Sequence, residues 1–252
     1  SHGVRGVFSE AMSFIKEGAI IVSATKGIEE GSMLTPSGIL NEALKGCRHK
    51  AIAVLSGPSF ANEVSRRLPA AVCAASSSAE AAKAVQKAFS TNYFRVYTNT
   101  DVIGVELGGA LKNVIAIAAG ISDGLALGHN ARAALITRGL AEMGRLGAAL
   151  GALPATFAGL SGLGDLVLTC TGPLSRNYTV GVSVGKGAPI DEVTGSMRMV
   201  AEGVKTCRGA RELALRHKVD MPITEAVYSV LYSGTSPKEA VMGLMSRELK
   251  DE

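Results

Sequence analysis

Apolar and polar positions alternate in blocks over the first hundred residues. Four short apolar runs have the length and composition of strands that are buried on both faces, at residues 19–23, 51–55, 70–74 and 94–97. Between and before them the pattern predicts helices at residues 9–16, 37–45, 61–66 and 79–89. Strands that alternate with helices predict a parallel sheet with helices on both faces.

The pattern changes near residue 100. From there on no run is typical of a strand, and helical periodicity predicts helices at residues 102–120, 130–150, 204–217, 223–231 and 237–249. Pro222 and Pro237 suit the first turns of the last two helices. The sequence therefore predicts two domains: an α/β domain at residues 1–100 and an all-α domain at residues 101–252.

Composition narrows the class of protein. The 252 residues are 47% hydrophobic, which is enough for a sizeable core and excludes a disordered chain. A net charge of +4, 4% aromatic residues and no tryptophan argue against a nucleic-acid-binding protein or a membrane-surface protein. Glycine, at 30 residues, exceeds its usual share of about 7%. This excess favours an α/β protein in which tight turns bring backbone close to phosphate groups.

The cysteines and histidines indicate neither a disulfide framework nor a metal site. The four cysteines are Cys47, Cys73, Cys170 and Cys207, and no two form a C-x-x-C pair. Wide spacing of this kind is typical of reduced thiols in a cytoplasmic protein. The four histidines also lack the spacing of metal ligands. The best apolar run, residues 114–121, falls short of the ~20 residues of a membrane span, so we expect none.

Lys112 is the most prominent candidate for chemistry because it lies in a strongly apolar helix. Gly104 and Gly108 precede it by eight and four residues, on the same helical face, and leave room there for a ligand. Burial would lower the pKa of the Lys112 ammonium toward the range of a general acid. The alternative is a lysine whose stem is buried while its ammonium reaches solvent. The sequence leaves both interpretations open.

Glycine-rich and hydroxyl-rich segments supply further candidates. Asp165 ends the loop of residues 159–165, where it either binds a buried lysine or caps a helix, and the spacing favours the cap. Ser175, Arg176 and Asn177 lie near a predicted helix start, which favours an anion site over an ordinary capped helix. Residues 55–61 and 26–28 each follow a predicted strand, where α/β sheets bind ligands, although plain turns fit equally.

One expected motif is absent from the sequence. Dinucleotide-binding domains open with a strand, the pattern G-x-G-x-x-G and a helix, and no such pattern follows a strand here. The chain starts at Ser1 without a methionine or the pattern of a signal peptide. If the protein binds a dinucleotide, we expect the glycine-rich phosphate loop and the first strands to precede Ser1 in the complete gene product.

Together these segments resemble bacterial NAD(P)-dependent glycerol-3-phosphate dehydrogenases. The resemblance covers essentially the whole chain in order, and any one motif is weak while the ordered set is specific. It rests on residues 26–28 (KGI), 56–61 (SGPSFA), 108–114 (GGALKNV), 162–166 (GLGDL), 169–170 (TC), 175–177 (SRN), 200–203 (VAEG) and 221–225 (MPITE).

The resemblance implies a fold and an activity. It implies the remainder of a Rossmann-type dinucleotide-binding domain followed by an all-α C-terminal domain. The family interconverts dihydroxyacetone phosphate and sn-glycerol 3-phosphate with NAD or NADP, and the product enters phospholipid synthesis. It further implies a cytoplasmic homodimer with a small phosphorylated substrate, no metal and no nucleic-acid partner.

The resemblance also implies roles for particular residues, carried over position by position. Lys112 matches the catalytic proton donor and acceptor, with Asp165, Asn113 and Thr169 beside it. The substrate-binding positions are Lys26, Gly57, Ser59, Lys112, Asp165, Ser175, Arg176 and Asn177. The cofactor-binding positions are Lys26, Ala61, Arg176, Val200 and Glu202.

Two other functions fit the same sequence. One is a related lysine-dependent hydroxyacid dehydrogenase, against which the Ser175-Arg176-Asn177 segment argues because it suits a phosphate. The other is a non-catalytic helical dimerisation or binding module, which only the missing glycine-rich motif supports. A strand followed by G-x-G-x-x-G upstream of Ser1 would favour the enzyme over the module. Because the glycine-rich motif is missing from the sequence given, we expect this chain by itself to bind the dinucleotide poorly.

Overall fold

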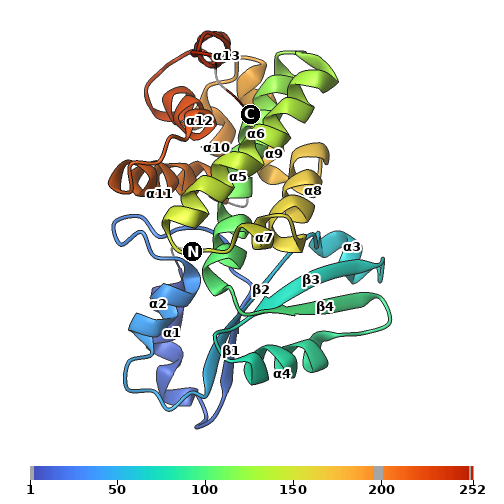
Figure 1. Ribbon diagram of the computed structural model, residues 1–252, viewed down its shortest axis with the longest axis vertical. Coiled ribbons are helices and arrows are strands. Elements are labelled where there is room, and N and C mark those ends of the chain that lie inside the picture. The colour runs from blue at the N-terminus through green and yellow to red at the C-terminus, as the bar shows by residue number, and fades with distance from the viewer. Residues whose placement is uncertain (1–2, 196–200, 250, 252) are drawn as a thin grey trace.

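The computed structural model describes residues 3–195, 201–249 and 251, and it places a mixed sheet below a bundle of helices (Figure 1). The sheet has four strands in the order β1-β2-β3-β4. They are β1 (Ile20–Ser23), β2 (Ala51–Ser56), β3 (Ala70–Ala75) and β4 (Phe94–Asn99). All four coincide with the predicted apolar runs to within two residues, and each buries at least one apolar side chain of its run.

One of the strand pairs contradicts the predicted parallel sheet. β1 pairs with β2, and β3 with β4, in parallel, but β2 and β3 are antiparallel. The connection between them carries only the five-residue α3 (Ala61–Ser65), none of whose residues is buried. A parallel crossover needs a dozen or more residues and a helix that packs on the sheet. Because α3 does not pack in this way, the chain turns back and the sheet is mixed.

Three further helical segments accompany the sheet. They are α1 (Val4–Ala11) with the short turn η1 (Met12–Phe14), α2 (Pro36–Ala43) and α4 (Ala79–Phe89). The first begins five residues before the predicted helix at residues 9–16. Val4 and Phe8, four residues apart on one face, pack against the cluster of Ile21, Leu40 and Leu44 and so fix the earlier start.

The remaining described residues, 101–195, 201–249 and 251, contain helices and no strand, as predicted. In order these are α5 (Val102–Gly124), α6 (Gly128–Ala149), α7 (Pro154–Phe157), the π-helical turn η2 (Leu160–Gly164), α8 (Asp165–Thr171), α9 (Arg176–Gly185), α10 (Ile190–Gly195), α11 (Glu202–Arg216), α12 (Pro222–Tyr232) and α13 (Pro237–Met245). The turn η2 lies in the segment predicted as a loop, and no bounds were predicted for α8, which follows it. Leu166 and Cys170 bury one face of α8, but seven residues are too few for periodicity to show a helix.

Helix α5 is the centre of the fold and runs from the sheet up through the helical bundle (Figure 1). Its contact with α9 depends on glycine. A side chain at Gly120 would meet the Tyr178 carbonyl oxygen, and one at Gly181 would meet the Ile117 carbonyl oxygen. The two backbones therefore touch directly, which fixes α9 and the segment before it relative to α5.

Helix α5 is also long and apolar enough to cross a membrane, judged by length and composition alone. The expectation of no span rested on residues 114–121, a shorter stretch than this helix. Its residues Gly104–Ser122 are buried against α6, α8, α9 and α11, as in the core helix of a soluble protein. The four cysteines are free thiols, in agreement with the sequence.

Candidate functional site

Lys112 lies in the middle of α5 and is almost fully buried. Its ammonium Nζ donates hydrogen bonds to Asp165 Oδ1 at 2.8 Å and to Thr169 Oγ1 at 2.7 Å. Asp165 and Thr169 are four residues apart on α8, so both face α5. The structure therefore brings Lys112 together with two residues that lie more than fifty positions after it in the sequence.

A second lysine completes this group. Lys26, in the loop after β1, donates from Nζ to Asp165 Oδ2 at 2.5 Å and to the Gly57 carbonyl oxygen at 3.3 Å. The Asp165 side chain is 2% exposed, so one buried carboxylate lies between two ammonium groups. We call Lys26, Lys112, Asp165 and Thr169 the lysine–aspartate cluster.

Burial and charge set the acidity of Lys112. Burial lowers the pKa of its ammonium from 10.5 to about 8, the positive charge of Lys26 acts in the same direction, and Asp165 opposes both. A pKa near 8 suits a group that must give and take a proton near neutral pH. The neighbouring Cys170 differs, since burial raises the pKa of its thiol to about 12 and keeps it protonated.

The preference for Asp165 as a helix cap is wrong. Asp165 is the first residue of α8, and no side chain caps this helix. Both carboxylate oxygens instead accept hydrogen bonds from lysines. Local spacing favoured a cap because it contains no information about the two ammonium groups, which come from distant parts of the chain.

The expected space beside the glycines of α5 is not there either. A side chain at Gly108 would lie 2.5 Å from the Ser161 carbonyl oxygen, and one at Gly104 would meet the Asp101 side chain. The backbone of η2 occupies the surface of α5 next to Lys112. Gly108 therefore admits the η2 turn, which leads directly into Asp165, and neither glycine leaves space for a ligand.

The turn after β2 lies next to the cluster. Gly57 has φ +144°, a conformation that other residues rarely adopt, and its carbonyl oxygen accepts from Lys26 and from Ser59 Oγ. Ser56, just before it, is buried against Gly109 of α5, and its hydroxyl has no partner among the described residues. Ala61 begins α3 and is exposed.

The predicted phosphate-binding residues are at the start of α9. Ser175 caps this helix by accepting from the Tyr178 amide, and Arg176 is exposed at its first position. Asn177 is buried and donates to Asn113 Oδ1 at 2.9 Å. Asn113 thus binds Asn177 rather than Lys112. Because Asn113 follows Lys112 on α5, this bond ties the start of α9 to the residue next to Lys112.

Two cofactor-binding predictions fall on the segment before α11. Glu202 is the first residue of α11 and is partly buried, while Val200 lies outside the described residues. The Gly203 amide donates to Asn177 Oδ1 at 2.9 Å. The start of α11 is therefore tied to the start of α9.

The sequence analysis missed two buried glutamates. Glu106 on α5 accepts from the Ser37 amide at 2.8 Å and from the hydroxyls of Thr35 and Ser37. Glu142 on α6 accepts from the amides of Ile223 and Thr224. Each carboxylate caps a helix from another part of the chain, and burial raises its pKa. A glutamate inside an apolar helical stretch was the signal that could have revealed Glu106.

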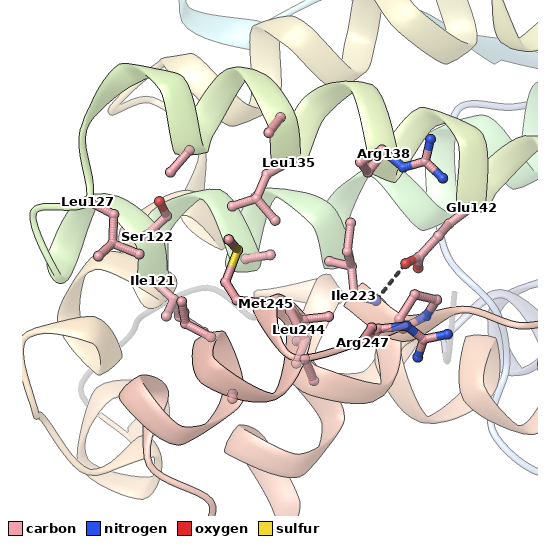
Figure 2. A pocket seen from close by; sticks show the side chains of 18 of the residues that line it. Ile121, Ser122, Leu127, Leu135, Arg138, Glu142, Ile223, Leu244, Met245 and Arg247 are labelled. Atoms are coloured by element: carbon pink, nitrogen blue, oxygen red, sulfur yellow. Dashed lines mark hydrogen bonds between the residues drawn. The ribbon is translucent and has the colours of Figure 1, made fainter. Parts of the chain in front are cut away.

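A separate apolar cavity of about 630 Å³ lies between α5, α6, α12 and α13 (Figure 2). Ala118, Ile121 and Ser122 line it from α5, and Glu142 marks one end, where Figure 2 shows its bond to the Ile223 amide. Its lining includes no member of the lysine–aspartate cluster. Among the residues that the structure describes, no group of three or more histidine, cysteine, aspartate or glutamate side chains could hold a metal ion.

Family profiles match both parts of the chain. The profile of the NAD-dependent glycerol-3-phosphate dehydrogenase N-terminus matches residues 1–82, and that of the C-terminus of the same family matches residues 101–242.

Individual proteins match over the whole chain. This chain is 59% identical to a glycerol-3-phosphate dehydrogenase [NAD(P)+] of Citrifermentans bemidjiense over 249 residues, which are 99% of this chain and 74% of that protein. It is 58% identical to the protein of that name in Geobacter sulfurreducens, over all of this chain and 75% of that protein. The solved glycerol-3-phosphate dehydrogenase of Coxiella burnetii has a TM-score of 0.90 and 42% identity, covering 98% of this chain and 75% of its own.

Proposed function

The chain belongs to the NAD-dependent glycerol-3-phosphate dehydrogenase family, and we propose that Lys112 is the proton donor and acceptor of its reaction. The protein is an oxidoreductase that interconverts dihydroxyacetone phosphate and sn-glycerol 3-phosphate with NAD or NADP. The observation that carries the proposal is the buried Lys112 ammonium, bonded to Asp165 and Thr169 in the centre of the fold.

The residues at the carboxyl end of β2 fit the reactive end of such a cofactor. Ser56 keeps a buried hydroxyl without a partner among the described residues, and Gly57 lets the chain turn sharply away from the strand. NADH or NADPH, when bound, supplies the hydride that reduces the carbonyl carbon. Lys26, Ala61, Arg176, Val200 and Glu202 are the residues that we propose to contact it.

Lys112 acts on the oxygen of the same carbonyl group. Negative charge develops on this oxygen as the carbonyl carbon is reduced, and a nearby ammonium stabilises it and then donates a proton. A pKa of about 8 leaves Lys112 mostly protonated at pH 7, ready to donate. In the reverse direction the neutral amine accepts the hydroxyl proton of glycerol 3-phosphate, which is favoured above pH 8.

The rest of the cluster orients and tunes Lys112. Asp165 and Thr169 take two of its three donor positions, so the third is directed to the substrate. Lys26 shares the Asp165 carboxylate and keeps the pKa of Lys112 low by its charge. We assign to Lys26, Gly57, Ser59 and Asp165 substrate contacts beside the reacting carbonyl.

The phosphate of the substrate belongs at the start of α9. Arg176 supplies a guanidinium that can bind two phosphate oxygens, and the amides of a helix N-terminus favour an anion. Asn177 and Ser175 flank it. The hydrogen bond from Asn177 to Asn113, the residue after Lys112, supports an anion site near Lys112, as a three-carbon phosphate requires.

The remaining proposals concern the whole protein. We propose that residues 1–100 serve as a dinucleotide-binding part and residues 101–252 as a substrate-binding part, with the cluster between them. We further propose a cytoplasmic homodimer whose product is used in phospholipid synthesis. The burial of α5 and the four free thiols support the proposed cytoplasmic location.

The test is turnover by the complete gene product and its Lys112→Ala variant, followed as oxidation of NADPH and of NADH by dihydroxyacetone phosphate. Loss of the general acid should lower kcat by roughly 10²- to 10⁴-fold. The control is Lys83→Ala, which removes an exposed lysine from α4 and should leave kcat unchanged. Near-full activity of Lys112→Ala would disprove its role. Equal turnover of glycerol and glycerol 3-phosphate would disprove the phosphate site.

A further inference from the structure

The loop that carries Lys26, residues 24–35, leaves the sheet after β1 but packs on the helical part of the molecule. Among its contacts there, Ile28 lies against Gly209 of α11, and Thr35, with Ser37 of α2, lies against Glu106 of α5. We propose that Gly209 and Glu106 are positioning residues, which place the Lys26 ammonium on Asp165. The inference rests on the proposed function of Lys112.

At Gly209 the side chain of Ile28 packs directly against the backbone of α11. Ile28 is fully buried and belongs to the main core of the helical part. A side-chain carbon added at Gly209 would lie 2.9 Å from Ile28 Cγ2 and 3.2 Å from its Cβ. Both are carbons close to the backbone, so the loop itself would have to move. Ile28 is two residues from Lys26, and the shift would reach the lysine.

Glu106 holds the other end of the loop. Its carboxylate accepts three hydrogen bonds from the first residues of α2: the Thr35 hydroxyl at 2.6 Å, the Ser37 amide at 2.8 Å and the Ser37 hydroxyl at 2.5 Å. Glu106 is six residues before Lys112 on α5. One helix thus carries both the catalytic lysine and the anchor of the loop that brings the second lysine to it.

Lys26 has a fixed path only while the loop stays in place. Carbons Cγ and Cδ of its stem lie in the space beside Gly109 of α5, and Nζ reaches Asp165 beyond it. Asp165 and Cys170 from α8 and Lys26 from the loop are the ionisable groups that act on Lys112. A displaced loop would remove Lys26 from this set and leave the Asp165 carboxylate to Lys112 alone.

The main test compares two glycine-to-alanine changes in helices of the complete gene product. Gly209→Ala should push Ile28 away, whereas Gly144→Ala on α6 meets no atom within 4 Å and is the matched control. The readout is the pH dependence of kcat/KM. The pH at which kcat/KM changes follows the titration of Lys112. In Gly209→Ala this transition should move upward by about one pH unit, because a neighbouring positive charge is lost. In Gly144→Ala it should stay in place.

A second set of variants tests the anchors without adding a clash. Ile28→Ala shortens the buried side chain, and Glu106→Leu removes the acceptors; each should shift the transition in the same direction as Gly209→Ala. Glu106→Gln keeps a side-chain oxygen for the Ser37 amide, so its pH transition in kcat/KM should lie at the wild-type position. Loss of thermal stability without any shift of the transition would mean a structural role only, and would overturn the inference.

Failure of this inference can be told apart from failure of the proposed function. If the transition persists in Lys112→Ala, it does not belong to Lys112, and the proposed function fails. If it disappears in Lys112→Ala but does not move in Gly209→Ala, Ile28→Ala or Glu106→Leu, only the positioning by Gly209 and Glu106 is wrong.

Discussion

Two stretches of α5, whose nearest ends are about 7.5 Å apart along its axis, have opposite surroundings. The stretch from Glu106 to Asn113 is packed tightly against η2, α8 and the Lys26 loop, and it buries charged groups. The stretch from Ala118 to Ser122 faces an apolar cavity of about 630 Å³ (Figure 2). We refer to them, each together with the side chains that contact it from other elements, as the polar stretch and the cavity stretch.

From this comparison we propose that the chemistry lies in the polar stretch rather than at the larger space. The cavity is lined mostly by apolar side chains, and the carboxylate of Glu142, at one end, is already bound to the amides of Ile223 and Thr224. The polar stretch has little room, yet Lys112 and Asp165 are buried there as charged groups, with the partly exposed Lys26 beside them, at a considerable cost in stability. Such a cost has a reason where a proton must be moved, and on this ground we propose that the buried charges mark the site.

The largest expected effect on stability comes from removing the shared carboxylate of the polar stretch. Asp165→Asn leaves two ammonium groups without their counter-charge, and the free energy of unfolding at pH 7 should fall by about 3–5 kcal/mol. Urea unfolding measures it. Glu212→Gln, on the exposed face of α11, is the control and should change stability by less than about 0.5 kcal/mol. An Asp165→Asn loss as small as that of the control would show that the pairing contributes little.

The second prediction concerns pH. The pKa of Lys112 is about 8 in the folded protein and 10.5 ordinarily, so the unfolded chain binds this proton more tightly. The destabilisation that comes from burying the charged Lys112 is therefore fully present below pH 8 and disappears above pH 10.5. Relative to Lys112→Met, the wild-type free energy of unfolding should rise by about 3 kcal/mol over this range. A flat difference, like that expected for Lys83→Met, would mean that the Lys112 pKa is not lowered.

The smallest effects come from removing one hydroxyl from each stretch. Thr169→Val deletes an acceptor for Lys112 and should lower the free energy of unfolding by about 1–3 kcal/mol. Ser122→Ala deletes a buried hydroxyl that has no partner among the described residues, and should be neutral or stabilising by up to about 1 kcal/mol. Thermal unfolding of both variants checks the pair. Equal destabilisation would remove the distinction between the two stretches.

Much of the fold was predictable because it depends on neighbours in sequence. The four strands appear where apolar residues run together, and α4 has the predicted bounds. The antiparallel pairing of β2 and β3 was not predictable in this way. It depends on whether α3 packs on the sheet, and five residues give no periodicity by which to judge that.

The sequence by itself determined which residue types are present, where most helices and strands lie and, through the order of its motifs, the family. Only the tertiary structure decided what several of these residues do. Lys26 and Asp165 are 139 positions apart and Lys112 and Asp165 are 53 apart, so no local pattern could show that they share hydrogen bonds. The same holds for Gly108 and Glu106, whose partners come from distant segments. Local propensities act over a few residues, whereas the charge, burial and spacing of a site arise only when the whole chain has packed.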